Sequence, residues 1–362
     1  MHETDAAILT EANRVMEICN ACRYCEGYCA VFPAMTLHRS FAEADLNHLA
    51  NLCHNCKACY YACQYAPPHP FGVNVPQAFA LLRDETYRRY AWPAPLARLF
   101  ERNGTVVSLV TALAVTAVLL LTAGLTAPGT LVHAAVGARA FYRVIPWAVM
   151  AGVATLALGY AVLAMTIGAV RYWRQSGSAQ VTTAAILRGV HDAFTLRNLG
   201  GGGQGCNDKD ESFSTTRRLL HHAMAYGFLA CFAATCTAAF AADILGWPAP
   251  YPWFSLPVIL GTLGGLGLLV GTSGLFGLKL VTDPTPLARR LLGGDIALLV
   301  LLWLTAASGM LVLGWRQTSE MPLLLAIHLG LILALFSLLP YSKFVHGLYR
   351  TLALIRAAAD RG

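Results

Sequence analysis

The sequence predicts a mainly α-helical, polytopic membrane protein with about six transmembrane helices and a smaller α-helical cytoplasmic domain at its N-terminus. Hydrophobic residues make up 56% of the 362 residues, charged residues make up 12%, and the mean hydropathy is +0.53. Ordinary soluble domains are less apolar and carry about twice that share of charge. Six long apolar stretches follow residue 100, whereas eight of the eleven cysteines lie before residue 64. We therefore expect a cytoplasmic domain at 1–100, a transmembrane domain at 101–350 and a cytoplasmic tail at 351–362.

The N-terminal segment has no feature of a cleavable signal. The stretch "MHETDAAILTEANRVMEICN" is polar and lacks the apolar core that a signal peptide needs. We therefore expect the N-terminus to stay in the cytoplasm. The domain ends in "YAWPAPLARLFERNG", a breaker-rich stretch that places Arg98 and Arg102 directly before the first apolar segment.

Two cysteine motifs of identical spacing lie in this domain. Each has the form C-x2-C-x2-C-x3-C, and the second repeats the first 34 residues later. Their members are Cys19, Cys22, Cys25 and Cys29, followed by Cys53, Cys56, Cys59 and Cys63. Three thiolates on such a loop bind three irons of a cubane, and in two-cluster ferredoxins the fourth cysteine ligates the other cluster. We predict a ferredoxin-like domain with two [4Fe–4S] clusters, with cluster 1 on Cys19, Cys22, Cys25 and Cys63, and cluster 2 on Cys53, Cys56, Cys59 and Cys29.

Structural zinc is the alternative interpretation, because four cysteines also bind that ion. Zinc sites usually pair two C-x2-C knuckles and do not need a third cysteine in the same run. Disulfides are not expected, since this spacing in a reducing compartment favours metal binding. Cys206, Cys231 and Cys236 lie outside the motifs, and we expect the last two to pack between helices.

The six apolar stretches are each long enough to cross the bilayer as a helix, which needs about 20 residues. We expect them at 105–126, 144–170, 219–242, 255–278, 296–315 and 321–346. Histidines aside, Lys343 is their only charged residue. In the fourth stretch, Gly267 and Gly271 have the spacing that permits close contact with a neighbouring helix.

The basic residues predict the orientation. Of the 26 lysines and arginines, only Arg139, Arg143 and Arg316 fall on the side opposite the N-terminal domain. The positive-inside rule then places both termini in the cytoplasm of a multi-pass protein of the bacterial inner membrane. Topology also accounts for the net charge of +7, and no basic run or aromatic-interleaved patch indicates nucleic acid. The long cytoplasmic loop at 171–218 contains Gly200–Gly203, which either permits a close backbone approach or forms a flexible connection.

Four histidines in the apolar stretches are candidate haem ligands. They are His221 and His222 in the third stretch and His328 and His346 in the last one. Ligand-capable residues within membrane spans are rare and usually functional. A b-type haem with two histidine ligands needs two neutral imidazoles on facing helices at one depth. His346 and one of the adjacent pair meet this condition near the cytoplasmic side.

His328 has no partner at its own depth. In one continuous helix over 321–346, His328 and His346 share a face, because 18 residues make five turns and about 27 Å. His328 then serves a quinone or a second haem, or it is a packed histidine bonded to a carbonyl. The sequence leaves one haem b or two open, and no residue in the chain is expected to be catalytic by itself.

The sequence resembles the membrane-bound iron–sulfur and b-haem proteins called tricarballylate utilization protein B or citrate utilization protein B. The resemblance covers nearly the whole chain and rests on "CNACRYCEGYCAVFP", "CHNCKACYYACQYAPPHPFGVNVP", "LRNLGGGGQGC", "RRLLHHAMAYGFL" and "LPYSKFVHGLYR". The last stretch is also similar to nitrate reductase gamma subunits, where two histidines of the final helix ligate separate haems. The partner helix departs from that pattern, because His221 and His222 are adjacent.

The resemblance implies an electron-transfer subunit that reoxidises the FAD of a partner dehydrogenase, with tricarballylate as that enzyme's substrate. Electrons would pass through two [4Fe–4S] clusters and haem b to a membrane quinone. No dinucleotide-binding glycine motif in its usual context is found, in agreement with a flavin on another chain. The alternatives are a membrane iron–sulfur redox sensor and an electron-transfer subunit of a heterodisulfide-reductase-like or cobalamin-biosynthesis system.

Overall fold

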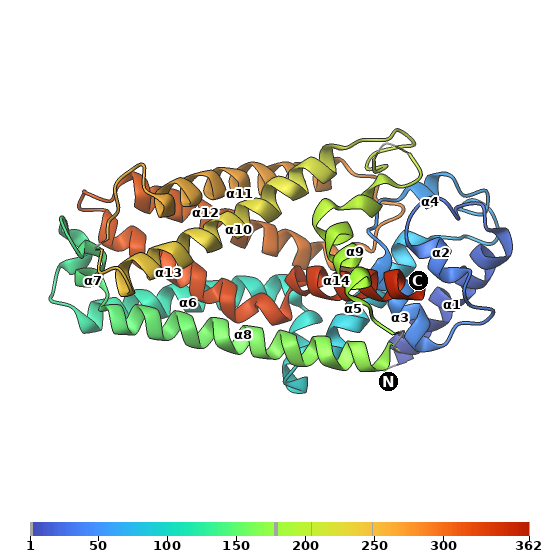
Figure 1. Cartoon of the computed structure of the whole chain (residues 1–362), viewed down its shortest axis with the longest axis horizontal. Helices are drawn as coiled ribbons and strands as arrows, with labels where there is room; N and C mark the ends of the chain where they lie inside the picture. The colour runs from blue at the N-terminus through green and yellow to red at the C-terminus, as the bar shows by residue number, and fades with distance from the viewer. Residues whose placement is uncertain (1–2, 177–179, 204, 248, 362) are drawn as a thin grey trace.

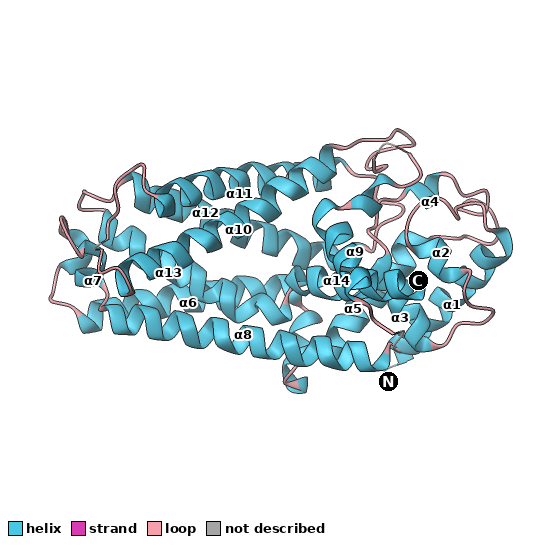
Figure 2. Cartoon of the chain, in the orientation of Figure 1, coloured by secondary structure: helices cyan, strands magenta, loops and turns pink. Residues whose placement is uncertain are grey.

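The computed structural model describes residues 3–176, 180–203, 205–247 and 249–361, and the chain is almost entirely helical (Figures 1 and 2). Over those residues no strand forms, and one isolated bridge joins Cys206 to Ser214. The blue N-terminal helices gather at one end of the elongated molecule, and the long helices extend from them (Figure 1). The predicted mainly α class is confirmed.

The N-terminal helices form a domain with its own apolar core, which we call the cluster domain. Its helices are α1 (Glu3–Cys22), α2 (Val31–Met35), α3 (Glu43–Leu52), α4 (Ala58–Tyr61) and α5 (Val75–Tyr90). Met16, Leu49 and Phe79 are fully buried where α1, α3 and α5 pack together. α5 begins where the Asn74 side chain accepts a hydrogen bond from the Gln77 backbone N–H, which satisfies one of the unpaired donors of the first turn.

Six helices are long and apolar enough, by length and composition, to cross a membrane. They are α6 (Asn103–Leu125), α8 (Trp147–Gln175), α10 (Thr216–Asp243), α11 (Leu256–Val281), α12 (Leu292–Gly314) and α13 (Met321–Leu338). Their starts and ends lie within a few residues of the predicted spans, except at the C-terminal end of the last one. The chain is therefore a multi-pass membrane protein, as predicted.

Short helices and 3-10 turns connect these elements. The α-helices are α7 (Ala140–Val144) and α9 (Thr183–Thr195), and the 3-10 turns are η1 (Ala94–Phe100), η2 (Thr130–Val132), η3 (Arg197–Gly200), η4 (Arg289–Leu291), η5 (Leu339–Tyr341) and η6 (Lys343–Val345). α9 lies in the predicted long loop at 171–218. That loop is therefore partly helical, and its helix returns to pack beside the C-terminal helix α14 (His346–Asp360).

Small residues let α10 and α11 approach each other closely. A side chain at Gly271 would meet the backbone of Met224, and one at Gly267 would meet the carbonyl of Ala223. The packing role predicted for these two glycines is therefore confirmed. Cys231 also lies between the two helices, as expected, but Cys236 is exposed, so its predicted packing role is wrong.

The prediction of one continuous helix over 321–346 is wrong at its C-terminal end. The helix stops at Leu338, because Pro340 has no backbone N–H to donate and its ring blocks a further helical turn. Ser342 is extended and accepts a hydrogen bond from the Phe344 backbone N–H, which starts the turn that leads into α14. His328 and His346 therefore lie on different helices and share no face.

α14 belongs to the cluster domain and does not form a separate tail. The predicted division at residue 350 falls inside this helix, and Ala353, Leu354 and Ala357 are buried in the core of the cluster domain. Arg356 pairs with Asp45 of α3, with 3.6 Å between guanidinium nitrogen and carboxylate oxygen. Figure 1 shows the red C-terminal helix among the blue ones. The two ends of the chain thus fold together.

Candidate functional site

The eight motif cysteines are free thiols in loops and helix ends of the cluster domain. Cys19 and Cys22 lie in the last turn of α1, Cys53 directly follows α3, and Cys59 lies in α4. Cys53 and Cys56 are buried and the other six are partly exposed. A set of free, mostly neighbouring thiols is the donor set that iron–sulfur clusters use.

Four of these thiols form a first neighbouring set. Burial raises the pKa of the Cys19 thiol to about 12, and the nearby thiols of Cys63, Cys25 and Cys22 add to the shift. Burial likewise raises the pKa of Cys25 to about 12, with Cys63 and Cys22 as its charged neighbours. Cys63 of the second motif therefore lies beside three cysteines of the first motif.

The other four thiols form a second neighbouring set. Burial raises the pKa of Cys29 well above its usual range, and its charged neighbours are Cys56 and Cys53. The same holds for Cys59, whose neighbours are Cys56, Cys53 and Cys29, and then Cys25 of the first set. Each motif thus contributes three cysteines to one set and one to the other, the arrangement in which two-cluster ferredoxins bind their clusters.

The backbone of the second motif turns tightly around its thiols. Asn55 and Lys57 adopt left-handed conformations with φ of 55° and 66°, which side-chain-bearing residues rarely adopt. The Asn55 backbone N–H donates to the Cys53 sulfur over 3.4 Å. Hydrogen bonds of this kind stabilise a thiolate and tune a cluster bound to it.

Within the described residues, no three His, Cys, Asp or Glu side chains meet around one point where a single metal ion would bind.

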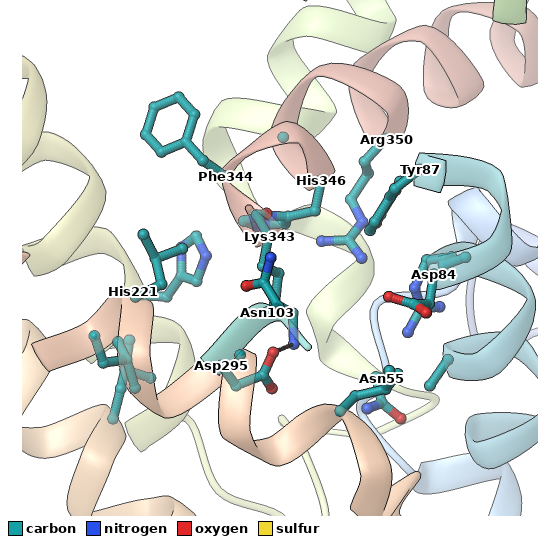
Figure 3. A pocket seen from close by; sticks show the side chains of 18 of the residues that line it. Asn55, Asp84, Tyr87, Asn103, His221, Asp295, Lys343, Phe344, His346 and Arg350 are labelled. Atoms are coloured by element: carbon teal, nitrogen blue, oxygen red, sulfur yellow. Dashed lines mark hydrogen bonds and ion pairs between the residues drawn. The ribbon is translucent and has the colours of Figure 1, made fainter. Parts of the chain in front are cut away.

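A cavity of about 1380 Å³ lies between the cluster domain and the membrane helices, and we call it the histidine cavity (Figure 3). Its walls include His54, Asn55 and Lys57 of the second cysteine motif, Met165 and Val170 of α8, His221 and His222 of α10, Asp295 of α12, and Lys343, His346 and Arg350 near the C-terminus. Pockets for small molecules commonly enclose about 300–1,000 Å³. The cavity is therefore large enough for a macrocyclic cofactor.

His221 and His346 face each other across this space. Their ring centroids are 6.1 Å apart and the ring planes are nearly perpendicular. Two imidazoles that bind one ion from opposite sides, at nitrogen-to-metal distances of about 2.0–2.1 Å, have ring centres roughly 6 Å apart. The pair therefore has the separation that a shared metal ion requires.

The hydrogen bonds of these histidines leave ring nitrogens free. His346 donates its Nδ1–H to the carbonyl of Lys343, which leaves Nε2 as a lone-pair donor. Burial, with the charge of Arg350, lowers the pKa of His346 well below its usual range, so its ring is neutral. His221 Nδ1 and His222 Nε2 are buried and have no hydrogen-bond partner among the described residues. The His222 ring lies beside Tyr226, so His221 is the better partner for His346.

His328 lies apart from the histidine cavity. Its Nδ1 is 2.8 Å from the Ser308 hydroxyl oxygen, and that hydroxyl in turn donates to the Thr305 carbonyl over 3.0 Å. His328 therefore donates its Nδ1–H to Ser308. Gly309 packs against the ring, and a side chain there would meet it at 3.0 Å. The predicted packed-histidine alternative, with a backbone carbonyl as partner, fits this environment, because His328 has a backbone hydrogen bond to Thr305 in addition to its contact with the Ser308 hydroxyl.

Sequence reasoning missed most of the charged residues around the cavity. Asp295 accepts from Lys279 over 2.6 Å and from Lys343 over 2.5 Å, and only Lys343 was visible as a charge within a predicted span. Burial lowers the pKa of Lys343 to about 8, although 47% of its side chain is accessible, because that surface faces the cavity. A sequence signal exists for Lys279, Asp295 and Arg217, which lie within two residues of the end of a predicted span. Arg83 has no such signal, because it lies in α5 of the cluster domain.

Comparison with known proteins identifies similar chains over the full length. The family model described as citrate utilization protein B matches residues 102–362, and the model described as the citrate utilization protein B Fer4-like domain matches residues 12–89. The protein called citrate utilization protein B in Escherichia coli is 46% identical over 362 residues, which cover 99% of this chain and 95% of that relative. No solved structure matches the chain.

Proposed function

Because the chain belongs to the citrate utilization protein B family, we propose that it is the membrane-bound electron-transfer partner of a flavoprotein dehydrogenase. Its matched Fer4-like domain and its six apolar helices support an iron–sulfur carrier at a membrane. The names of the family and of its relative point to citrate utilization, and the resemblance to tricarballylate utilization proteins points to a tricarboxylate as the substrate of the dehydrogenase.

The observation that carries this proposal is the sorting of the eight thiols into two sets of four. Cys19, Cys22, Cys25 and Cys63 would hold cluster 1, and Cys53, Cys56, Cys59 and Cys29 would hold cluster 2. The chain buries Cys53 and Cys56 and leaves the other six thiols partly exposed. The Asn55 N–H bond to Cys53 stabilises one thiolate directly.

His346 and His221 would hold a b-type haem in the histidine cavity. When bound, the clusters and the haem accept and release single electrons, which is the chemistry that links a two-electron flavin to a quinone. The Lys343 carbonyl accepts from Nδ1 of His346 and so fixes the tautomer in which Nε2 carries the lone pair that would bind the iron. Burial keeps the ring neutral, since the protonated form cannot bind a metal.

A quinone of the bilayer is the acceptor that suits the position of the cavity. The cavity is bounded by apolar side chains of α8, α10 and α12, among them Met165, Phe228 and Leu302. A redox sensor would need the clusters alone, so the facing histidines favour electron transfer over sensing. The proposed location is the bacterial inner membrane with the cluster domain in the cytoplasm.

Anaerobic purification of the full chain followed by optical spectroscopy tests the function. Addition of a reduced flavoprotein dehydrogenase should produce the absorption spectrum of a reduced b-type haem, and a soluble quinone analogue should then reoxidise it. A preparation with clusters and haem that never accepts electrons from reduced flavin would overturn the proposal. A preparation without iron and acid-labile sulfide would remove its basis.

A further inference from the structure

The two proposed clusters have different surroundings. All four thiols of cluster 1 are partly exposed, and Tyr24 beside Cys25 is 67% exposed. In cluster 2, Cys29 and Cys59 are also partly exposed, but Cys53 and Cys56 are buried and retain only 7% and 8% of their surface. Cluster 1 therefore lies toward the outside of the domain, and cluster 2 lies toward its interior.

The loop that carries cluster 2 also forms a wall of the histidine cavity. His54, Asn55 and Lys57, which lie between Cys53 and Ala58, line the cavity together with His221 and His346. No residue between Cys19 and Cys29 lines it. The loop of cluster 2 thus separates that cluster from the two histidines, and cluster 1 has no such contact.

Three arginines bind this loop from the cavity side, and we call Arg83, Arg217 and Arg350 the arginine collar. Arg83 and Arg350 both donate to the carbonyl of Cys53, over 2.9 Å and 3.0 Å. Arg217 donates to the carbonyl of Asn55 over 2.6 Å. The collar comes from α5, α10 and α14, so three elements distant in sequence meet at one cysteine loop.

From this arrangement we infer that cluster 2 delivers electrons to the histidine cavity, that cluster 1 receives them first, and that the arginine collar sets the potential of cluster 2. The inference rests on the proposed function and assigns its direction. An added electron makes a cluster more negative, so three nearby positive charges in a low-dielectric site stabilise the reduced form. The collar therefore raises the potential of cluster 2 above that of cluster 1, and electrons flow from cluster 1 to cluster 2.

Gly200–Gly203, which we call the glycine loop, also approach cluster 2. A side chain at Gly201, whose φ is 54°, would meet Ala58 at 2.8 Å and the Cys56 sulfur at 3.1 Å. The backbone at Gly201 therefore lies directly against Cys56, one ligand of cluster 2. A second cavity of about 1030 Å³ is bounded by these glycines and by Cys29. It is the alternative entrance for electrons, in place of cluster 1.

A redox titration of the full chain, followed by electron paramagnetic resonance, tests the role of the collar. Arg350→Gln should lower the midpoint potential of one cluster by about 59 mV or more, which is a tenfold change in a one-electron equilibrium. The cluster with the lowered potential should be cluster 2, whose signal remains in Cys22→Ser. Arg350→Lys keeps the charge and should restore most of the potential. Arg217→Gln provides a second collar variant if Arg350→Gln does not fold.

Arg23→Gln is the matched control, because Arg23 is next to Cys22 and its side chain donates to the nearby Asn20 carbonyl and not to the second motif, which lies wholly within the described residues. It should leave the potential of cluster 2 unchanged. A collar variant that shifts cluster 1, or that shifts neither cluster, overturns the inference. Wild-type protein without clusters or haem would instead overturn the proposed function, so the two failures are distinguishable.

Photoreduced FMN as a soluble electron donor tests the direction. In Cys22→Ser, the reduction of the haem should slow at least tenfold, because cluster 1 no longer receives electrons first. An undiminished rate would place the entrance at the cavity beside Cys29 and overturn the order. In Cys56→Ser, cluster 1 should still be reduced while the haem stays oxidised, and haem reduction at the wild-type rate would also overturn it.

Discussion

The two cysteine motifs have the same spacing but differ in what surrounds them. The first motif turns at the surface, where Tyr24 is 67% exposed and Gly27 has open space around it. The second motif contacts the arginine collar and the glycine loop and borders the histidine cavity. Its Lys57 is only 2% exposed. The same ligand pattern therefore supplies one accessible site and one enclosed site.

This difference follows from elements far away in the sequence. Lys57 donates to the hydroxyl of Thr282 and to the carbonyl of Asp208, and Tyr61 donates to Asp283 over 2.7 Å. Loops between the membrane helices thus cover much of the second motif, whereas on the first motif they reach Tyr28, which Gly202 contacts closely. The comparison indicates that identical local motifs acquire different surroundings from their tertiary contacts.

The largest expected effect is loss of the haem by His346→Ala. This substitution removes the only described ring that faces His221, so the b-type haem spectrum should disappear while both cluster signals remain. His328→Ala is the matched control and should keep the haem spectrum, because His328 bonds Ser308 away from the cavity. Optical spectra of both purified variants measure this. A retained haem spectrum in His346→Ala would show that the histidine cavity beside the second motif does not hold the haem.

The next largest effect is expected from Cys56→Ser compared with Cys22→Ser. Each should lower the iron content by removing or altering one cluster, but Cys56→Ser should also lower the thermal stability more, since Cys56 is 8% exposed and lies under the glycine loop. Burial of an unpaired polar group costs about 1–3 kcal/mol. Thermal denaturation followed by circular dichroism measures the difference. Equal losses of stability would contradict the contrast between the motifs.

A smaller effect is expected from Gly201→Ala. The new side chain would clash with Ala58 and the Cys56 sulfur, and the φ of 54° is unfavourable for alanine by about 1–2 kcal/mol. The signal of cluster 2 should weaken or broaden while that of cluster 1 stays unchanged. Gly27→Ala, on the first motif, has room and no left-handed φ, and should leave both signals intact. Electron paramagnetic resonance of the two variants distinguishes the outcomes.

The smallest effect is expected from Arg23→Gln at the exposed end of the first motif. Among the described residues its guanidinium donates to the Asn20 carbonyl alone, so the free energy of unfolding should change by no more than about 0.5 kcal/mol. Chemical denaturation measures it. A loss of several kcal/mol would show that the first motif is as tightly enclosed as the second.

Much of the fold was predictable, because its signals are local. The six spans follow from runs of apolar residues, which a bilayer requires of any crossing helix, and the family prediction is confirmed by 46% identity over the chain. The break after Leu338 was not predicted, although Pro340 marks it, because the sequence does not show whether a proline kinks a helix or ends it. The helix α14 was taken for a tail because its partners lie in the first domain.

The sequence by itself determined the candidate ligand residues, the number of apolar spans and the family. These features follow from the cysteines and histidines and from their spacing along the chain. They do not depend on how distant segments meet. Only the tertiary structure decided that His221 faces His346, that Arg83 and Arg350 share the Cys53 carbonyl, and that the two motifs differ in burial. These features depend on long-range packing between segments up to 297 residues apart, which no local pattern encodes.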